Sequence, residues 1–162
     1  MKNYVLRCSM VVPRSLEETF RFFEEPHNLS RITPPWLNFQ VKHGQLEMKN
    51  GLGIDYTIRW LGLPMKWRSR ITQYNPPYRF VDQQERGPYR YWHHLHEFKS
   101  VPGGTLVTDE VTYALPLGFL GRMAHALVVR RQLEGIFRFR QKALTEILGS
   151  AETEKQLAEN RA

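Results

Sequence analysis

The chain has 162 residues, of which 41% are hydrophobic and 24% charged, the length and composition of one folded domain with a sizeable core. No apolar run approaches the roughly 20 residues of a transmembrane helix, and the apolar N-terminal stretch is too short for a signal peptide. The single cysteine, Cys8, excludes an internal disulfide and a cysteine-based structural zinc site. We therefore expect a cytoplasmic, non-membrane-spanning domain in which Cys8 is a small core residue.

The charge balance is basic, with 23 Lys and Arg against 16 Asp and Glu and a formal net charge of +7. Such a surplus attracts phosphates, nucleic acids or anionic membrane surfaces. No nucleic-acid recognition motif accompanies it, so we expect no nucleic-acid partner. Contact with an anionic membrane surface or an acidic protein stays open.

The N-terminal part predicts one strand followed by two small helices. Residues 4–13 are β-prone, and proline closes the run. Ser15 and Glu18 have capping-box spacing, which predicts a short helix ending before Pro26. A second helical turn is expected over residues 27–32, where it is followed by a threonine and two prolines.

The middle of the chain predicts an antiparallel meander. Turn residues such as Asn50-Gly51 and Gly87-Pro88 separate the strand-like runs, and such short links join antiparallel neighbours. The predicted strands are Leu37–Met48, Gly53–Leu61, Met65–Tyr74, Tyr78–Glu85, Tyr89–Lys99 and Thr105–Ala114.

The C-terminal part predicts one long amphipathic helix over residues 122–148, ending at Gly149. Its apolar face would hold Met123, Ala126, Val129, Leu133, Ile136, Phe137, Leu144, Ile147 and Leu148. Residues 150–162 are polar and are expected to form a flexible tail outside a single domain of residues 1–149. The predicted class is α+β, with the helix laid over one face of the sheet.

Several segments resemble the START-like, helix-grip superfamily (SRPBCC, polyketide cyclase-like), in particular a bacterial ligand-binding branch of it. They are Asn28-Leu29 with Ile32-Thr33-Pro34, Phe80 to Gln84, Gly87-Pro88-Tyr89, Trp92 to Phe98, Gly103-Gly104-Thr105 with Asp109 and Tyr113, and Phe137 to Arg140. The resemblance spans residues 3 to about 148. It implies a curved antiparallel sheet wrapped around one long C-terminal helix, with two short helices after the first strand. The superfamily includes carriers, receptors and enzymes, so it does not fix the activity.

Strand alternation predicts which side chains share a cavity between sheet and helix. Trp92, His94, His96 and Phe98 fall on one face of their strand, and the neighbouring strands place similar aromatic and polar mixtures on the same side. An apolar wall with a few polar groups is typical of a small-molecule site. The predicted ligand-contacting residues are Tyr56, Trp67, Phe80, Gln84, Trp92, His94, His96, Phe98, Asp109, Tyr113, Leu133, Phe137 and Arg140.

The two inward histidines, His94 and His96, admit three interpretations. They can be buried histidines bonded to Asp82 or Asp109, ligand contacts in a cavity, or metal ligands. Two such histidines with one aspartate would make a two-His, one-carboxylate set, but no pattern marks a third ligand. We therefore expect no metal and no cofactor.

Arg140 lies near the centre of the apolar helix face. A guanidinium cannot be neutralised there, so it must pair with a carboxylate, reach the mouth of the domain or hold an anionic ligand group. Asp82 and Asp109 are the candidate partners.

Standard hydrolase, kinase, dehydrogenase and zinc-protease motifs are absent from the sequence. The favoured hypothesis is binding of a hydrophobic or amphipathic small molecule such as a lipid, quinone or polyketide. One alternative is a cyclase or dehydratase that uses His94, His96 and Asp82 as acid and base. The other is a peripheral adaptor that docks through a basic helix stripe of Arg122, Arg130, Arg131, Arg138 and Lys142.

Overall fold

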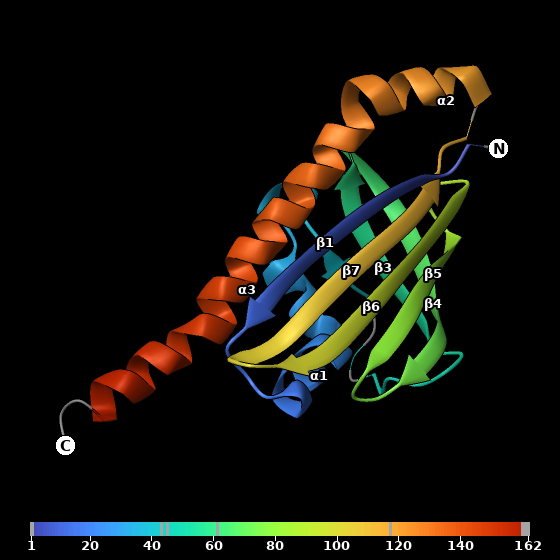
Figure 1. Cartoon of the computed structure of the whole chain (residues 1–162). Helices are drawn as coiled ribbons and strands as arrows, with labels where there is room; N and C mark the ends of the chain where they lie inside the picture. The colour runs from blue at the N-terminus through green and yellow to red at the C-terminus, as the bar shows by residue number, and fades with distance from the viewer. Residues whose placement is uncertain (1, 43, 45, 61, 117, 160–162) are drawn as a thin grey trace.

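A seven-stranded antiparallel sheet forms the body of the protein, in the order β1-β7-β6-β5-β4-β3-β2 (Figure 1). The computed structural model describes residues 2–42, 44, 46–60, 62–116 and 118–159. The strands are β1 (Tyr4–Val12), β2 (Gln40–Val41), β3 (Gly53–Trp60), β4 (Leu63–Asn75), β5 (Arg79–Arg86), β6 (Tyr91–Val101) and β7 (Gly104–Ala114). The predicted α+β helix-grip class is confirmed.

The first strand closes one edge of the sheet by pairing with the last one. β1 runs antiparallel to β7, from Tyr4 opposite Tyr113 to Val12 opposite Thr105. The approach is close at Gly104, which has a φ of 145°, because a Cβ built there would lie 2.0 Å from the Val12 carbonyl oxygen. Only glycine fits this position without displacing β1.

Three short helical elements follow β1: α1 (Leu16–Glu24), η1 (Pro26–Ile32) and η2 (Pro35–Leu37). The predicted capping box begins α1, since the Ser15 side chain accepts the Glu18 N–H while the Glu18 carboxylate accepts the Ser15 N–H. α1 buries Phe20 and Phe23 against the sheet. The second predicted helical turn is present as the 3₁₀ helix η1.

The predicted strand over residues 37–48 is wrong for most of its length. Among the described residues of this segment, strand pairing with β3 is confined to Gln40–Val41. The preceding prolines favour the 3₁₀ turn of η2, and Asn38 ends that turn with a left-handed φ of 43°. The apolar side chains of this segment, such as Phe39 and Met48, turn toward the interior and line a cavity instead of extending the sheet.

The C-terminal helix is longer than predicted at both ends. α2 (Gly118–Ala124), the π-helical turn η3 (His125–Val129) and α3 (Arg130–Glu159) follow one another, and α2 bends away from α3 across η3 (Figure 1). The helix passes the predicted end at Gly149, because one glycine costs only about 1 kcal/mol and the following Ala, Glu, Lys and Leu residues favour helix. Met123, predicted on the apolar face, is 45% exposed. The bend removes α2 from the sheet.

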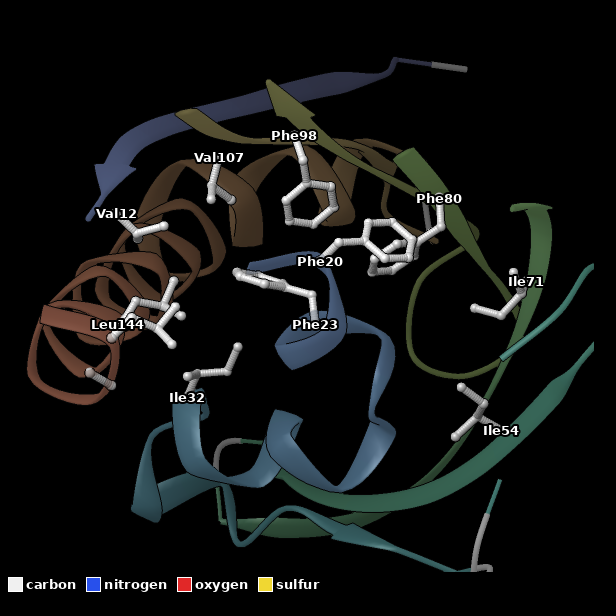
Figure 2. Close-up of a cluster of buried hydrophobic side chains, with 12 residues drawn as sticks. Val12, Phe20, Phe23, Ile32, Ile54, Ile71, Phe80, Phe98, Val107 and Leu144 are labelled. Atoms are coloured by element: carbon white, nitrogen blue, oxygen red, sulfur yellow. The ribbon is translucent and has the colours of Figure 1, made fainter. Parts of the chain in front are cut away.

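Two hydrophobic clusters fill the space between the sheet and α3. The first joins α1, the strands and α3 through residues that include Phe20, Phe80, Phe98 and Leu144, and Figure 2 shows these side chains pointing toward one another. The second cluster contains the aromatic residues Trp67, Tyr89, Trp92 and Tyr113 with Val111, Val129, Leu133 and Phe137; Cys8, half-buried, packs against it. No helix in the described part of the chain is long and apolar enough to cross a membrane.

Candidate functional site

A buried polar network lies between the two hydrophobic clusters. Asp82 on β5, His94 and His96 on β6, and Asp109 on β7 all face inward, as alternation predicts. The strand register places Asp82 opposite His94 and His96 opposite Asp109. Arg140 approaches the same group from α3 and is only 6% exposed.

Each histidine contacts both carboxylates. His94 Nε2 and His96 Nδ1 each lie 2.9 Å from Asp109 Oδ1. On the opposite side, His96 Nε2 lies 3.1 Å and His94 Nδ1 3.5 Å from Asp82 Oδ2. Arg140 Nη2 is 3.4 Å from Asp109 Oδ1, so the cation on the apolar helix face pairs with Asp109. Of the two partners that the sequence left open for Arg140, the ion pair is with Asp109.

The network shifts the pKa values of the two histidines in opposite directions. Burial, reinforced by the neighbouring His96, lowers the pKa of His94 to about 4. Burial also opposes the charge of His96, but its hydrogen bonds with Asp109 and Asp82 outweigh this effect and raise the pKa of His96. Burial acts against the Asp109 charge as well, yet Arg140 and the two histidines hold the pKa of that carboxyl well below its usual range. The raised pKa favours the charged form of His96, which together with Arg140 offsets the negative charge of the two carboxylates.

Hydrogen bonds extend the network toward β3 and β4. Ser69 donates its hydroxyl to Asp82 Oδ1 at 3.2 Å and accepts the indole N–H of Trp67 at 3.1 Å. The Tyr56 hydroxyl lies 3.3 Å from Ser69 Oγ. Burial raises the pKa of Asp82, but the hydrogen bond from His96 and the charge of His94 lower it by more. The net effect is a lowered pKa for Asp82.

The network forms one wall of a cavity of about 80 Å³. The polar wall contains Tyr56, Ser69, Asp82, His94, His96 and Arg140. The remaining lining is apolar apart from Asn28 and comes from α1, η1, the segment after η2, and β3 to β5: Phe22, Phe23, Pro26, Leu29, Ile32, Phe39, Val41, Met48, Ile54, Ile71 and Phe80. Figure 2 shows five of these side chains, Phe23, Ile32, Ile54, Ile71 and Phe80, pointing into the space that the sheet curves around.

The structure brings some of the predicted contact residues to this cavity and places others elsewhere. Tyr56, Phe80, His94, His96 and Arg140 line it, as does the acid–base candidate Asp82. Asp109 lies behind the histidines, where it lines a gap of about 10 Å³ with Phe137 and Arg140.

Four further predicted contact residues lie away from this cavity: Trp67, Gln84, Trp92 and Phe98. Trp67 and Trp92 pack edge to face at a centroid distance of 5.3 Å inside the aromatic cluster. Phe98 is in the other cluster, between α1 and the sheet. Gln84 instead fixes the β5–β6 connection, because its side-chain amide bonds both the N–H and the carbonyl of Tyr89. Large aromatic side chains on the inward face were enough to predict burial, but not which part of the interior stays open.

Tyr113 and Leu133 border a second depression, of about 250 Å³, between β1 and the start of α3. It is larger than the cavity described above but has no contact with the histidine–aspartate network. Its charged lining residues, Arg130 and Glu134, form a surface ion pair with each other at 2.9 Å. We therefore place the candidate site at the smaller, network-lined cavity.

Sequence reasoning missed the cavity residues that come from α1, η1 and the segment after η2. Phe23 recurs at helical spacing with Leu16 and Phe20, and Ile32 belongs to the predicted second helical turn, but nothing in the sequence indicated which space they border. Alternation predicts that Ile54, Ser69 and Ile71 share the inward face of Tyr56 and Trp67, although the predicted ligand contacts did not include them.

The predicted basic stripe is partly neutralised on α3. Arg130 pairs with Glu134, and Lys142 lies 3.9 Å from Glu146. Arg131 and Arg138 are exposed, whereas the side chain of Arg122 lies outside the described residues. Exposed pairs of this kind contribute little to stability, and they weaken the case for the stripe as a docking surface.

Comparison with protein families then assigns the chain. Residues 12–137 match the family of polyketide cyclases, dehydrases and lipid-transport proteins. The chain belongs to this family. A search of curated proteins finds no match. The family covers both enzymes and lipid carriers, which is the same division that the sequence left open.

Solved structures share the fold at low sequence identity. Protein CV1439 from Chromobacterium violaceum matches with a TM-score of 0.69 and 14% identity, over 89% of this chain and 96% of that one. Major latex-like protein 151 from Panax ginseng matches with a TM-score of 0.67 and 12% identity, over 90% and 97%. A nucleoside-diphosphate sugar epimerase from Corynebacterium glutamicum matches with a TM-score of 0.62 and 23% identity, over 87% of this chain but 28% of that one. These likenesses show the helix-grip fold.

Proposed function

We propose that the protein binds an amphipathic small molecule, with an apolar body and one polar or anionic end, in the cavity beside the histidine–aspartate network. The observation that carries this proposal is the division of the cavity wall into a broad apolar part and one polar side. Apolar burial would supply most of the affinity, at roughly 25 cal/mol per Å² before association costs. Polar groups would orient the ligand.

Arg140 and the histidines are the groups that would receive the polar end. Arg140 Nε is buried without a hydrogen-bond partner among the described residues, so this donor has unused capacity. His94 and His96 border the same cavity. A carboxylate, phenolate or quinone oxygen at this wall would accept hydrogen bonds, and the apolar body would then extend toward Ile54 and Ile71.

The size of the cavity limits how binding can occur. Sites for drug-sized ligands usually measure about 300 to 1,000 Å³, whereas this cavity has about 80 Å³. A lipid-sized ligand must therefore displace part of the wall. Of the cavity wall, the segment around β2 has the shortest strand pairing, with two residues opposite β3. We infer that this segment moves when a ligand enters.

Filling the cavity with a larger side chain tests this proposal. Met48 lines the cavity and is half-buried, so Met48→Trp can occupy the ligand space without overpacking the core. Calorimetric titration of metal-stripped protein with decanoate, 2-naphthol and a short-chain ubiquinone should show binding of at least one probe by wild type. For that probe the variant should bind about tenfold or more weakly.

The matched control is Met10→Trp. Met10 is also half-buried and packs against the same hydrophobic cluster, but it borders the small gap beside α3 and not the proposed site. Met10→Trp should change affinity by no more than about twofold. Wild type that binds none of the three probes, or equal losses in the two variants, would contradict the proposal.

An acid–base enzyme acting on a polyketide-like substrate is the second candidate, because Asp82, His94 and His96 border the same cavity. His94 is the free-base partner at neutral pH. This candidate requires that His94→Ala abolish turnover of a bound poly-β-ketone while its affinity stays unchanged. A parallel loss of affinity would instead assign His94 to ligand binding.

A further inference from the structure

Three donor atoms of the network converge on one point of the cavity wall. The imidazole nitrogens His94 Nδ1 and His96 Nε2 face the same oxygen of Asp82, at 3.5 and 3.1 Å. All three donor atoms lie within 4.8 Å of one another. Two ligands of one transition-metal ion, each at about 2.1 Å, are about 3.0 to 3.4 Å apart in octahedral or tetrahedral geometry. The two carboxylate–imidazole spacings are close to that range.

The two imidazole nitrogens that face away from Asp82 contact Asp109. His94 Nε2 and His96 Nδ1 both lie 2.9 Å from Asp109 Oδ1. The hydrogen bond between His94 Nε2 and Asp109 leaves a lone pair on His94 Nδ1 when the neutral ring donates this N–H. His96 makes its hydrogen bond to Asp82 through Nε2, while Arg140 Nη2 lies 3.5 Å from His96 Nδ1. A carboxylate behind an imidazole, as Asp109 is behind His94, is the usual outer support of a metal-binding histidine.

The two neutral rings cannot supply a hydrogen bond to every carboxylate contact in the network. Four imidazole–carboxylate contacts are present, whereas two neutral rings supply only two N–H groups. Arg140 matches the charge of Asp109 at 3.4 Å, and Ser69 donates to the outer oxygen of Asp82. The Asp82 oxygen between the two rings has a hydrogen bond with His96 Nε2 and faces His94 Nδ1 at 3.5 Å, so a single cation at this point would contact all three groups.

We propose that Asp82, His94 and His96 bind one divalent transition-metal ion, such as Zn²⁺ or Fe²⁺, at the wall of the cavity. Two imidazoles and one carboxylate suit these ions, and the adjoining cavity leaves positions for water or a ligand oxygen. The metal would take the place of the proton between His96 Nε2 and Asp82 Oδ2. This departs from the metal-free expectation drawn from the sequence, because the fold brings Asp82 opposite His94 from a separate strand.

Metal titration of the full chain tests the site without any organic ligand. Protein stripped with EDTA is titrated with Co²⁺, followed by visible absorption, and with Zn²⁺, followed by calorimetry. One ion per chain should bind, and His94→Ala, His96→Ala and Asp82→Asn should each weaken binding about 100-fold or more. Asp109→Asn should weaken it about 10- to 100-fold through the loss of ring orientation.

His93→Ala is the matched control, since His93 is the next residue on β6, points to the opposite face and stacks on Tyr91. It should bind both ions as wild type does. Circular dichroism of each variant without metal verifies folding, and Asp82→Asn keeps the side-chain shape if an alanine variant fails to fold.

Wild type that binds neither ion stoichiometrically would overturn the proposal and leave the network as a proton-holding group. Binding that survives His94→Ala and Asp82→Asn would also overturn it by placing the metal elsewhere. Neither result affects the cavity-filling test, because that test uses metal-stripped protein.

Discussion

The two buried aspartates differ in what neutralises them. Asp109 lies between both histidines and Arg140, and its side chain is only 8% exposed. Asp82 borders the cavity, is 19% exposed and contacts the histidines and Ser69. Removing one member of a buried ion pair leaves the other charge uncompensated, which makes the Asp109–Arg140 pair the part of the network on which folding depends most.

A double-mutant cycle tests this pair. Arg140→Leu should lower the free energy of unfolding by about 3 to 5 kcal/mol, and Asp109→Asn combined with it should show a coupling energy of about 0.5 to 3 kcal/mol. Urea unfolding measures both quantities. Arg130→Leu is the control on the same helix, because Arg130 is 69% exposed in its pair with Glu134 and should change stability by less than about 1 kcal/mol. Strict additivity of the two network changes would contradict the pairing.

The edge strand β2, which borders the cavity, is held less firmly than the other strands of the sheet. β6 pairs with β7 at eleven positions. β2 pairs with β3 at two positions, Gln40 opposite Thr57 and Val41 opposite Tyr56. One further backbone bond, from Lys42 N–H to the Asp55 carbonyl, extends this contact. Segments with so few hydrogen bonds open at low free energy.

Hydrogen–deuterium exchange tests whether this wall opens. The amides of Gln40 and Val41 should exchange at least about 100-fold faster than those in the middle of β7, since local opening of β2 breaks few bonds. A probe that binds in the cavity should slow exchange in residues 38–42 and leave β1 unchanged. Equal protection of β2 and β7, or a probe that protects β1 instead, would contradict the opening of this wall.

Much of the fold could be predicted from the sequence, but less of the candidate site. Alternation along β6 correctly placed His94 and His96 on the inward face, because a strand offers only two faces. The helical period likewise placed Arg140 among buried residues. The open space could not be predicted, since it depends on how Phe39 and Met48 follow the turn after Pro35.

The same limit explains why Trp67 and Trp92 lie outside the described cavity. Both face inward, as predicted. They pack against Tyr89 and Tyr113 in the aromatic cluster and do not line the cavity. The helix end was also missed, because one glycine is a weak stop signal when strong helix formers follow it. Sequence periodicity thus predicts which side chains point inward. The packing of the folded chain decides which of these inward side chains remain accessible to a ligand.

Isoleucine methyl NMR tests whether an amphipathic ligand binds beside the network. Of the six isoleucines, Ile32, Ile54 and Ile71 line the cavity, whereas Ile58, Ile136 and Ile147 lie elsewhere. Titration with whichever calorimetric probe binds should shift the first three methyl signals and leave the other three within error. Shifts confined to Ile58, Ile136 and Ile147, or no shifts at saturation, would contradict the account.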